Sequence, residues 1–212
     1  MTLTERLIAD GLMSIVRHVS PDELLPTAQA LAAGGVKFME VTMNTDRALE
    51  SIALLSEHFA DGDMVIGAGT VMNADMARAA VGAGARFLVS PHTDPALIAE
   101  ALELGAVPVP GVMTPSDVAT ARNAGAHVLK LFPAATMGPD YVRHLLAPFN
   151  GTAFFAVGGV DMTNAVSFLN AGACGLGLGT SLVDPKIVAQ GNFRAITDRA
   201  RTYRDILNEA RG

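Results

Sequence analysis

Two ionisable side chains, Lys130 and Glu40, lie inside segments of the sequence that are mostly apolar. Lys130, one of only three lysines in 212 residues, lies in the run His127-Val128-Leu129-Lys130-Leu131-Phe132-Pro133, and Glu40 lies in the run from Val36 to Met43. Burial lowers the pKa of a lysine, so Lys130 would offer a nucleophilic amine that forms Schiff bases with ketones. At a strand end it could instead carry its ammonium group to water. An acid and an amine in two separate strands favour a shared cleft.

Further polar residues and glycines follow other apolar segments. Arg17 could bind a carboxylate or a phosphate, or it could lie on the surface. Thr70 follows Gly67-Ala68-Gly69, which permits close approach, and its hydroxyl could bind substrate or cap a helix. Gly158-Gly159 and Gly177-Leu178-Gly179-Thr180-Ser181 could bind phosphate through backbone N–H groups, or supply the positive φ of turns. Two such glycine segments favour phosphate binding.

Short apolar segments must position these residues. The expected strands cover residues 12–17, 36–42, 64–68, 86–90, 107–109, 127–132, 153–157 and 174–178. Five of them follow glycines, at positions 35, 84, 105, 125 and 172, which recur at about 20 residues or about twice that spacing. A glycine there fits the end of a helix that turns into a strand. Typical helix starts stand at Ser20-Pro21-Asp22-Glu23, Asp94-Pro95 and Thr114-Pro115-Ser116-Asp117.

Eight strands that alternate with helices predict an α/β fold, a (β/α)8 TIM barrel, with residues 1–212 as one single domain. Chemistry in this fold gathers at the C-terminal strand ends, where the residues above would converge. A doubly wound open sheet is the competing architecture, because Gly175-Leu176-Gly177-Leu178-Gly179 resembles a dinucleotide-binding motif. That motif lies near the C-terminus and lacks the final spaced glycine.

Composition limits the partners. Half of the residues are hydrophobic, which predicts a large buried core. Acidic side chains outnumber basic ones by 21 to 15 with no basic run, so we expect no nucleic-acid partner. The histidines show no metal-ligand spacing, and we expect neither a metal nor another cofactor. Cys174 is the only cysteine, and the sequence shows neither a signal peptide nor a membrane-spanning apolar stretch, which predicts a cytoplasmic protein.

Six motifs, in chain order through nearly the whole sequence, resemble the class I aldolases that cleave 2-dehydro-3-deoxy-6-phospho sugar acids. They are Glu40-Val41-Thr42, Gly67-Ala68-Gly69-Thr70-Val71, Ser90-Pro91, Pro110-Gly111, Lys130-Leu131-Phe132-Pro133 and Gly158-Gly159-Val160. Any one motif is weak, whereas the joint occurrence of the lysine strand and the Glu-Val-Thr strand is specific.

The resemblance implies that Lys130 forms a Schiff base with the C2 ketone and that Glu40 acts as general acid and base, through water. It places the pyruvate carboxylate near Thr70. The phosphate would lie at Gly158, Gly159 and the loop of Gly179, Thr180 and Ser181. The ligands would be a phosphorylated sugar acid and pyruvate, and members of this family are commonly homotrimers.

Within this family the sequence is more similar to the phosphogalactonate branch than to the phosphogluconate branch. Arg17 and the segment from Ala156 to Val160 resemble the former, while Asn44 and Val157 replace an arginine and a threonine of the latter. Cleavage of 4-hydroxy-2-oxoglutarate is an alternative activity. A sugar-phosphate isomerase or a ligand-binding barrel without turnover would use the same glycine loops but would need no Lys130.

Overall fold

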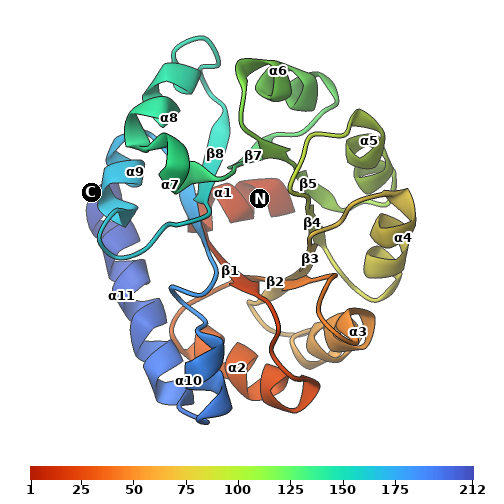
Figure 1. Cartoon of the computed structure of the whole chain (residues 1–212). Coiled ribbons are helices and arrows are strands. Elements are labelled where there is room, and N and C mark those ends of the chain that lie inside the picture. The colour runs from red at the N-terminus through yellow and green to blue at the C-terminus, as the bar shows by residue number, and fades with distance from the viewer.

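Parallel strands form a closed barrel in the computed structural model, which describes residues 1–212. The strands are β1 (Leu12–Val16), β2 (Phe38–Thr42), β3 (Val65–Gly69), β4 (Phe87–Val89), β5 (Val107–Val109), β6 (Gly111–Val112), β7 (Val128–Leu131), β8 (Ala153–Val157) and β9 (Gly175–Leu178). Their hydrogen-bonded order is β5-β4-β3-β2-β1-β9-β8-β7-β6. Because β5 and β6 are parts of one chain segment, the ring closes through that segment (Figure 1). The predicted TIM barrel is confirmed, and the doubly wound sheet is wrong.

The eight predicted strands all form, with ends that differ from the prediction by two residues or fewer. The fifth is longer than expected, because the chain pairs again at β6 after Pro110. Prolines have no backbone N–H to donate to a neighbouring strand, and Pro108 and Pro110 both lie in this segment. The carbonyl of Pro110 still accepts a hydrogen bond from the N–H of Lys130, at 2.9 Å.

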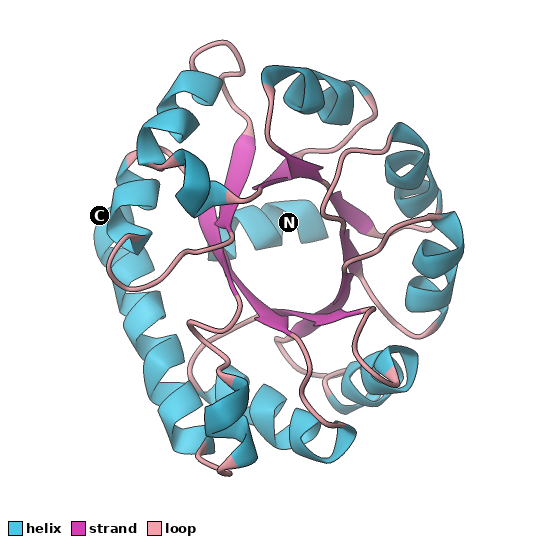
Figure 2. Cartoon of the chain, in the orientation of Figure 1, coloured by secondary structure: helices cyan, strands magenta, loops and turns pink.

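Helices surround the ring of strands on its outer side (Figure 2). Those that follow the strands are α2 (Pro21–Ala33), α3 (Ala48–His58), α4 (Ala74–Gly82), α5 (Pro95–Glu103), α6 (Pro115–Asn123), α7 (Ala134–Met137), α8 (Pro139–Leu146), α9 (Ala165–Asn170), α10 (Pro185–Ala189) and α11 (Phe193–Arg211). The predicted starts of α2, α5 and α6 are confirmed. The capping box is complete at Thr114 but absent at Ser20, whose hydroxyl donates to the Glu23 carboxylate instead.

The glycines that separate helices from strands take the expected conformation. Gly35, Gly84, Gly105, Gly125 and Gly172 all have φ between 73° and 106°. Side chains with a Cβ rarely adopt this backbone geometry, so each glycine lets a helix end and the chain turn back into the barrel. The repeat that predicted the barrel therefore reflects a conformational requirement.

Apolar side chains pack in two layers. One cluster of 50 buried residues lies between the strands and the helices, and a second cluster of 11 fills the barrel interior. Within the interior, the rings of Phe38 and Phe87 meet edge to face with centroids 5.9 Å apart. A Cβ at Gly67 would lie 2.5 Å from the Phe87 ring, so this glycine makes room for the aromatic pair. The barrel interior is thus a packed apolar core around these two rings.

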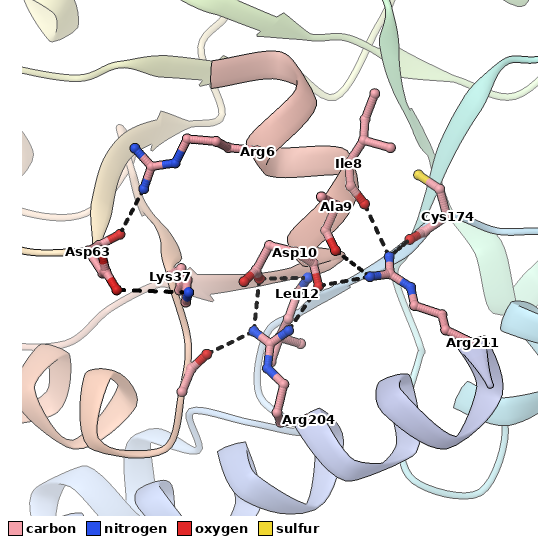
Figure 3. A network of polar contacts seen from close by, with 11 residues as sticks. Arg6, Ile8, Ala9, Asp10, Leu12, Lys37, Asp63, Cys174, Arg204 and Arg211 are labelled. Atoms are coloured by element: carbon pink, nitrogen blue, oxygen red, sulfur yellow. Dashed lines mark hydrogen bonds and ion pairs between the residues drawn. The ribbon is translucent and has the colours of Figure 1, made fainter. Parts of the chain in front are cut away.

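An additional helix, α1 (Leu3–Asp10), lies across the amino end of the barrel (Figure 1). The strand and helix patterns did not predict it, although Thr2 and Glu5 form a capping box that signals its start. Leu7 inserts into the interior cluster. Polar contacts join α1 to the end of α11 (Figure 3): Arg204 binds the Asp10 carboxylate at 2.8 Å, and Arg211 donates to backbone carbonyls of α1 and to that of Cys174. No helix has the length and apolar character needed to cross a membrane.

Candidate active site

A cavity of about 790 Å³ opens at the carboxyl ends of the strands. All of the predicted site residues except Glu40 line it, namely Arg17, Thr70, Lys130, Val157, Gly158, Gly159, Gly179, Thr180 and Ser181. These residues come from β1, β3, β7, β8 and β9 or from the loops that follow. They lie up to 164 residues apart in the sequence, and they meet because parallel strands all end on the same side of the barrel. The structure thus brings nine of the ten predicted site residues together around one cavity, and Glu40 is the exception.

Lys130 projects into this cavity from β7. Its side chain is almost fully buried, with only 6% of the residue exposed, and its Nζ lies 4.7 Å from the centroid of the Phe132 ring. Burial lowers the pKa of the Lys130 ammonium; the Glu40 charge opposes that shift and the Arg17 charge adds to it. The structure therefore favours the neutral amine more than water does.

Glu40 lies on β2 and does not line the cavity, and only 1% of the residue is exposed. A Cβ on Gly69 would lie 2.3 Å from Glu40 Oε1, so the missing side chain on β3 creates the space that the carboxyl occupies. Its Oε2 has no hydrogen-bond partner in the protein. Burial raises the pKa of Glu40 to about 7, against the lowering effects of Lys130 and Arg17. A carboxyl with this pKa can both accept and return a proton near neutral pH.

Arg17 and Thr70 lie together on the side of the cavity formed by β1 and β3. The Nη2 of Arg17 donates to Thr70 Oγ1 at 3.2 Å. Thr70 has φ of 56°, in the left-handed region, and it does not cap the next helix, because Asn73 caps α4. Of the two roles open to Thr70, only the one in the cavity fits this placement.

The glycine loops after β8 and β9 expose backbone donors. The N–H groups of Gly158, Gly159, Gly179, Thr180 and Ser181 donate to no backbone carbonyl. Gly158 and Gly159 have φ of 91° and 74°, so turn geometry alone would require glycine there. Gly179 differs, because its φ is not positive and a Cβ would meet nothing within 4 Å. Free backbone N–H groups in glycine loops commonly bind anions.

Three charged residues that sequence reasoning missed also line the cavity: Asp161, Asp184 and Lys186. The Asp161 carboxylate accepts from the N–H of Thr163 at 2.8 Å, and that of Asp184 accepts from the N–H of Lys186 at 2.9 Å. Both acids thus stabilise turns. They follow β8 and β9 in the chain, so attention to every polar residue beyond a strand end would have found them.

Comparison with known proteins defines the class. The family model described as KDPG and KHG aldolase matches residues 3–199, and with the barrel it makes this protein an aldolase, a carbon–carbon lyase. The chain belongs to the KDPG and KHG aldolase family. The resemblance drawn from the six motifs is confirmed, and the isomerase and ligand-binding alternatives are not favoured.

Relatives in the family cover nearly the whole chain. A 2-dehydro-3-deoxy-phosphogluconate aldolase of Treponema pallidum is 32% identical over 201 residues, which are 93% of each chain. A 2-dehydro-3-deoxy-6-phosphogalactonate aldolase of Escherichia coli is 34% identical over 172 residues, 81% of this chain and 83% of that one. A KDPG aldolase of Legionella pneumophila, solved with pyruvate captured as a covalent carbinolamine, superposes with a TM-score of 0.89 at 28% identity, covering 95% of this chain and 98% of its own.

Proposed function

We propose that this protein is a class I aldolase that cleaves 2-dehydro-3-deoxy-6-phosphogalactonate to pyruvate and glyceraldehyde 3-phosphate. The observation that carries the proposal is Lys130, a buried amine that lines the cavity at the carboxyl ends of the strands and whose pKa burial lowers. Relatives named for the phosphogluconate and phosphogalactonate substrates support the substrate class. The carbinolamine of the Legionella relative supports covalent chemistry with pyruvate.

Lys130 would begin the reaction. Its neutral amine adds to the C2 ketone, and the carbinolamine so formed takes up one proton and loses water, which leaves a positively charged iminium that links C2 to Nζ. The positive iminium then accepts the electron pair of the C3–C4 bond, so that cleavage yields an enamine instead of an unstabilised carbanion. Because burial favours the neutral amine, the nucleophile is available near neutral pH.

Glu40 would carry the protons. In its ionised form it accepts the proton of the C4 hydroxyl, through water, as the C3–C4 bond breaks and the aldehyde forms. It then returns that proton to C3 of the enamine. Water hydrolyses the resulting iminium, which releases pyruvate, free Lys130 and the proton that was taken up when the iminium formed. A pKa of about 7 suits both directions of this transfer.

The two anionic ends of the substrate would bind in different parts of the cavity. Arg17 and Thr70 form a charged and hydroxyl-bearing pair for the carboxylate. The free N–H groups of the two glycine loops would bind the phosphate. We prefer the galactonate epimer because Val157 lines the cavity and offers no hydrogen bond to a sugar hydroxyl.

Borohydride reduction in the presence of pyruvate tests the Schiff base. We expect one stable adduct, mapped by mass spectrometry to Lys130, which Lys130→Ala abolishes. Lys37→Ala is the matched control, because Lys37 pairs with Asp63 at 3.8 Å and lies outside the cavity. An adduct on Lys37 or Lys186, or no adduct, would overturn the assignment.

We also propose a homotrimer in the cytoplasm. The family resemblance supports the trimer, and the single cysteine suits a reducing compartment. Light scattering coupled to size exclusion gives the mass in solution, with three copies of a 22.0 kDa chain expected. A monomer or dimer mass would contradict the proposed assembly.

A further inference from the structure

Lys186 is a cation in the cavity that the proposed reaction steps do not use. It lies at the start of α10, shortly after the loop of Gly179, Thr180 and Ser181, and it lines the same cavity. No carboxylate of the protein pairs with its ammonium group. The Asp184 carboxylate binds the backbone N–H of Lys186 instead. The ammonium group is therefore available to a ligand.

Negative charges near the glycine loops would disfavour phosphate binding unless a cation offset them. Asp161 and Asp184 both line this part of the cavity, and either would repel a phosphate dianion. The backbone N–H groups of the loops contribute dipoles but no net positive charge. The other cations of the lining are Lys130 and Arg17, and the Arg17 guanidinium already donates a hydrogen bond to Thr70.

We propose that Lys186 binds the terminal phosphate of the substrate and offsets the repulsion from Asp161 and Asp184. The inference rests on the proposed function, because it assigns one end of that substrate. An ammonium group on a flexible four-carbon stem binds phosphate as a point charge, without fixed geometry. Lys186 would thereby select phosphorylated sugar acids, while the chemistry at Lys130 proceeds without it.

Lys186→Met removes the charge and keeps much of the apolar stem, and Lys186→Arg restores the charge. We expect Lys186→Met to lower kcat/KM for the phosphorylated substrate by about 10- to 100-fold, mainly through KM, and to weaken competitive inhibition by inorganic phosphate to a similar degree. Lys186→Arg should recover most of both losses. Lys37→Met, at the other end of the barrel, should change neither.

Trapping of pyruvate on Lys130 separates this inference from the proposed function. Pyruvate carries no phosphate, so the rate of adduct formation should be the same in Lys186→Met and in the unmodified protein. Normal trapping with an unchanged kcat/KM and unchanged phosphate inhibition would overturn the role of Lys186. Slower trapping in Lys186→Met would also overturn it, because the residue would then act on the chemistry. Absence of trapping in the unmodified protein would instead overturn the Schiff-base proposal, and phosphate binding measured by calorimetry would still decide whether Lys186 binds phosphate.

Discussion

The two ends of the barrel differ in whether their polar groups have hydrogen-bond partners. At the amino end, α1 covers the opening, Leu7 enters the interior cluster and the Arg204 guanidinium binds the Asp10 carboxylate and two backbone carbonyls (Figure 3). At the carboxyl end, backbone N–H groups of the glycine loops lack acceptors and Glu40 Oε2 is buried without a partner. Hydrogen-bonding groups are therefore paired at the amino end, where they stabilise the fold, and unpaired at the carboxyl end, where they can bind a ligand.

Charge distribution follows the same division. The Arg204–Asp10 pair is largely buried, with 20% and 8% of the side chains exposed, and each partner compensates the other. Lys130 and Glu40 are more deeply buried but have no salt bridge or hydrogen bond to each other. Burial lowers the pKa of Lys130 and raises that of Glu40, so it favours the neutral form of each. Substitutions at the two ends should therefore separate activity from stability.

The largest effect is expected at Glu40. Glu40→Gln removes the proton acceptor while keeping the shape of the side chain, so turnover should fall by about 10²- to 10⁴-fold. Adduct formation with pyruvate should persist, because Lys130 is intact. Steady-state kinetics and borohydride trapping on the same preparation check both statements. Turnover close to that of the unmodified protein would move the acid–base role to another group.

Arg204→Met should have the converse effect at the amino end. Loss of the guanidinium leaves the Asp10 carboxylate and nearby carbonyls without their donor, and the free energy of unfolding should fall by about 3 kcal/mol. The kcat/KM of the folded protein should stay within about twofold. Urea unfolding and kinetics measure the two quantities. Arg194→Met is the control, since the Arg194 side chain is 91% exposed and its loss should cost at most about 0.5 kcal/mol. A loss of kcat/KM in Arg204→Met without a loss of stability would contradict the assignment of stability to the amino end and of activity to the carboxyl end.

Stability should also depend on pH through Glu40. Because burial raises the pKa of Glu40 from 4.5 to about 7, the folded protein keeps a proton in this window that the unfolded chain releases. The free energy of unfolding should fall as pH rises through the window, by about 3 kcal/mol at most. Glu40→Gln cannot ionise, so urea unfolding at pH 5 and pH 8 should show a smaller fall for the variant. Parallel pH profiles would contradict the raised pKa.

The smallest effect concerns the choice of epimer at Val157. This residue packs against Gly177, where a Cβ would lie 2.7 Å from Val157 Cγ2, and it also lines the cavity. Val157→Thr keeps that shape and adds a hydroxyl, which should shift the kcat/KM ratio toward the gluconate epimer by up to about tenfold. Parallel kinetics on the two epimers measure the ratio. A strong initial preference for the gluconate epimer that the substitution leaves unchanged would refute the assignment.

Local sequence patterns predicted the strands because each strand is encoded by its own apolar residues and, in five of the eight, by the glycine that precedes it. The same patterns missed α1, whose docking depends on contacts with residues that follow it by about 200 positions, such as Arg204 and Arg211. They also missed the interruption between β5 and β6. It arises because Pro108 and Pro110 have no backbone N–H to donate to the neighbouring strands.

For the site, the sequence determined which residues are unusual and that parallel strands would bring their ends together. Lys130 and Glu40 stood out because burying a charge within an apolar strand costs free energy, and a residue kept there at that cost indicates a functional role. Only the tertiary structure decided the environments of these charges. The space beside Gly69 holds the Glu40 carboxyl, Arg17 donates to Thr70, and Lys186 lines the cavity without a carboxylate partner. Desolvation and charge pairing depend on every atom that surrounds a group, and those atoms come from strands that lie far apart in the chain.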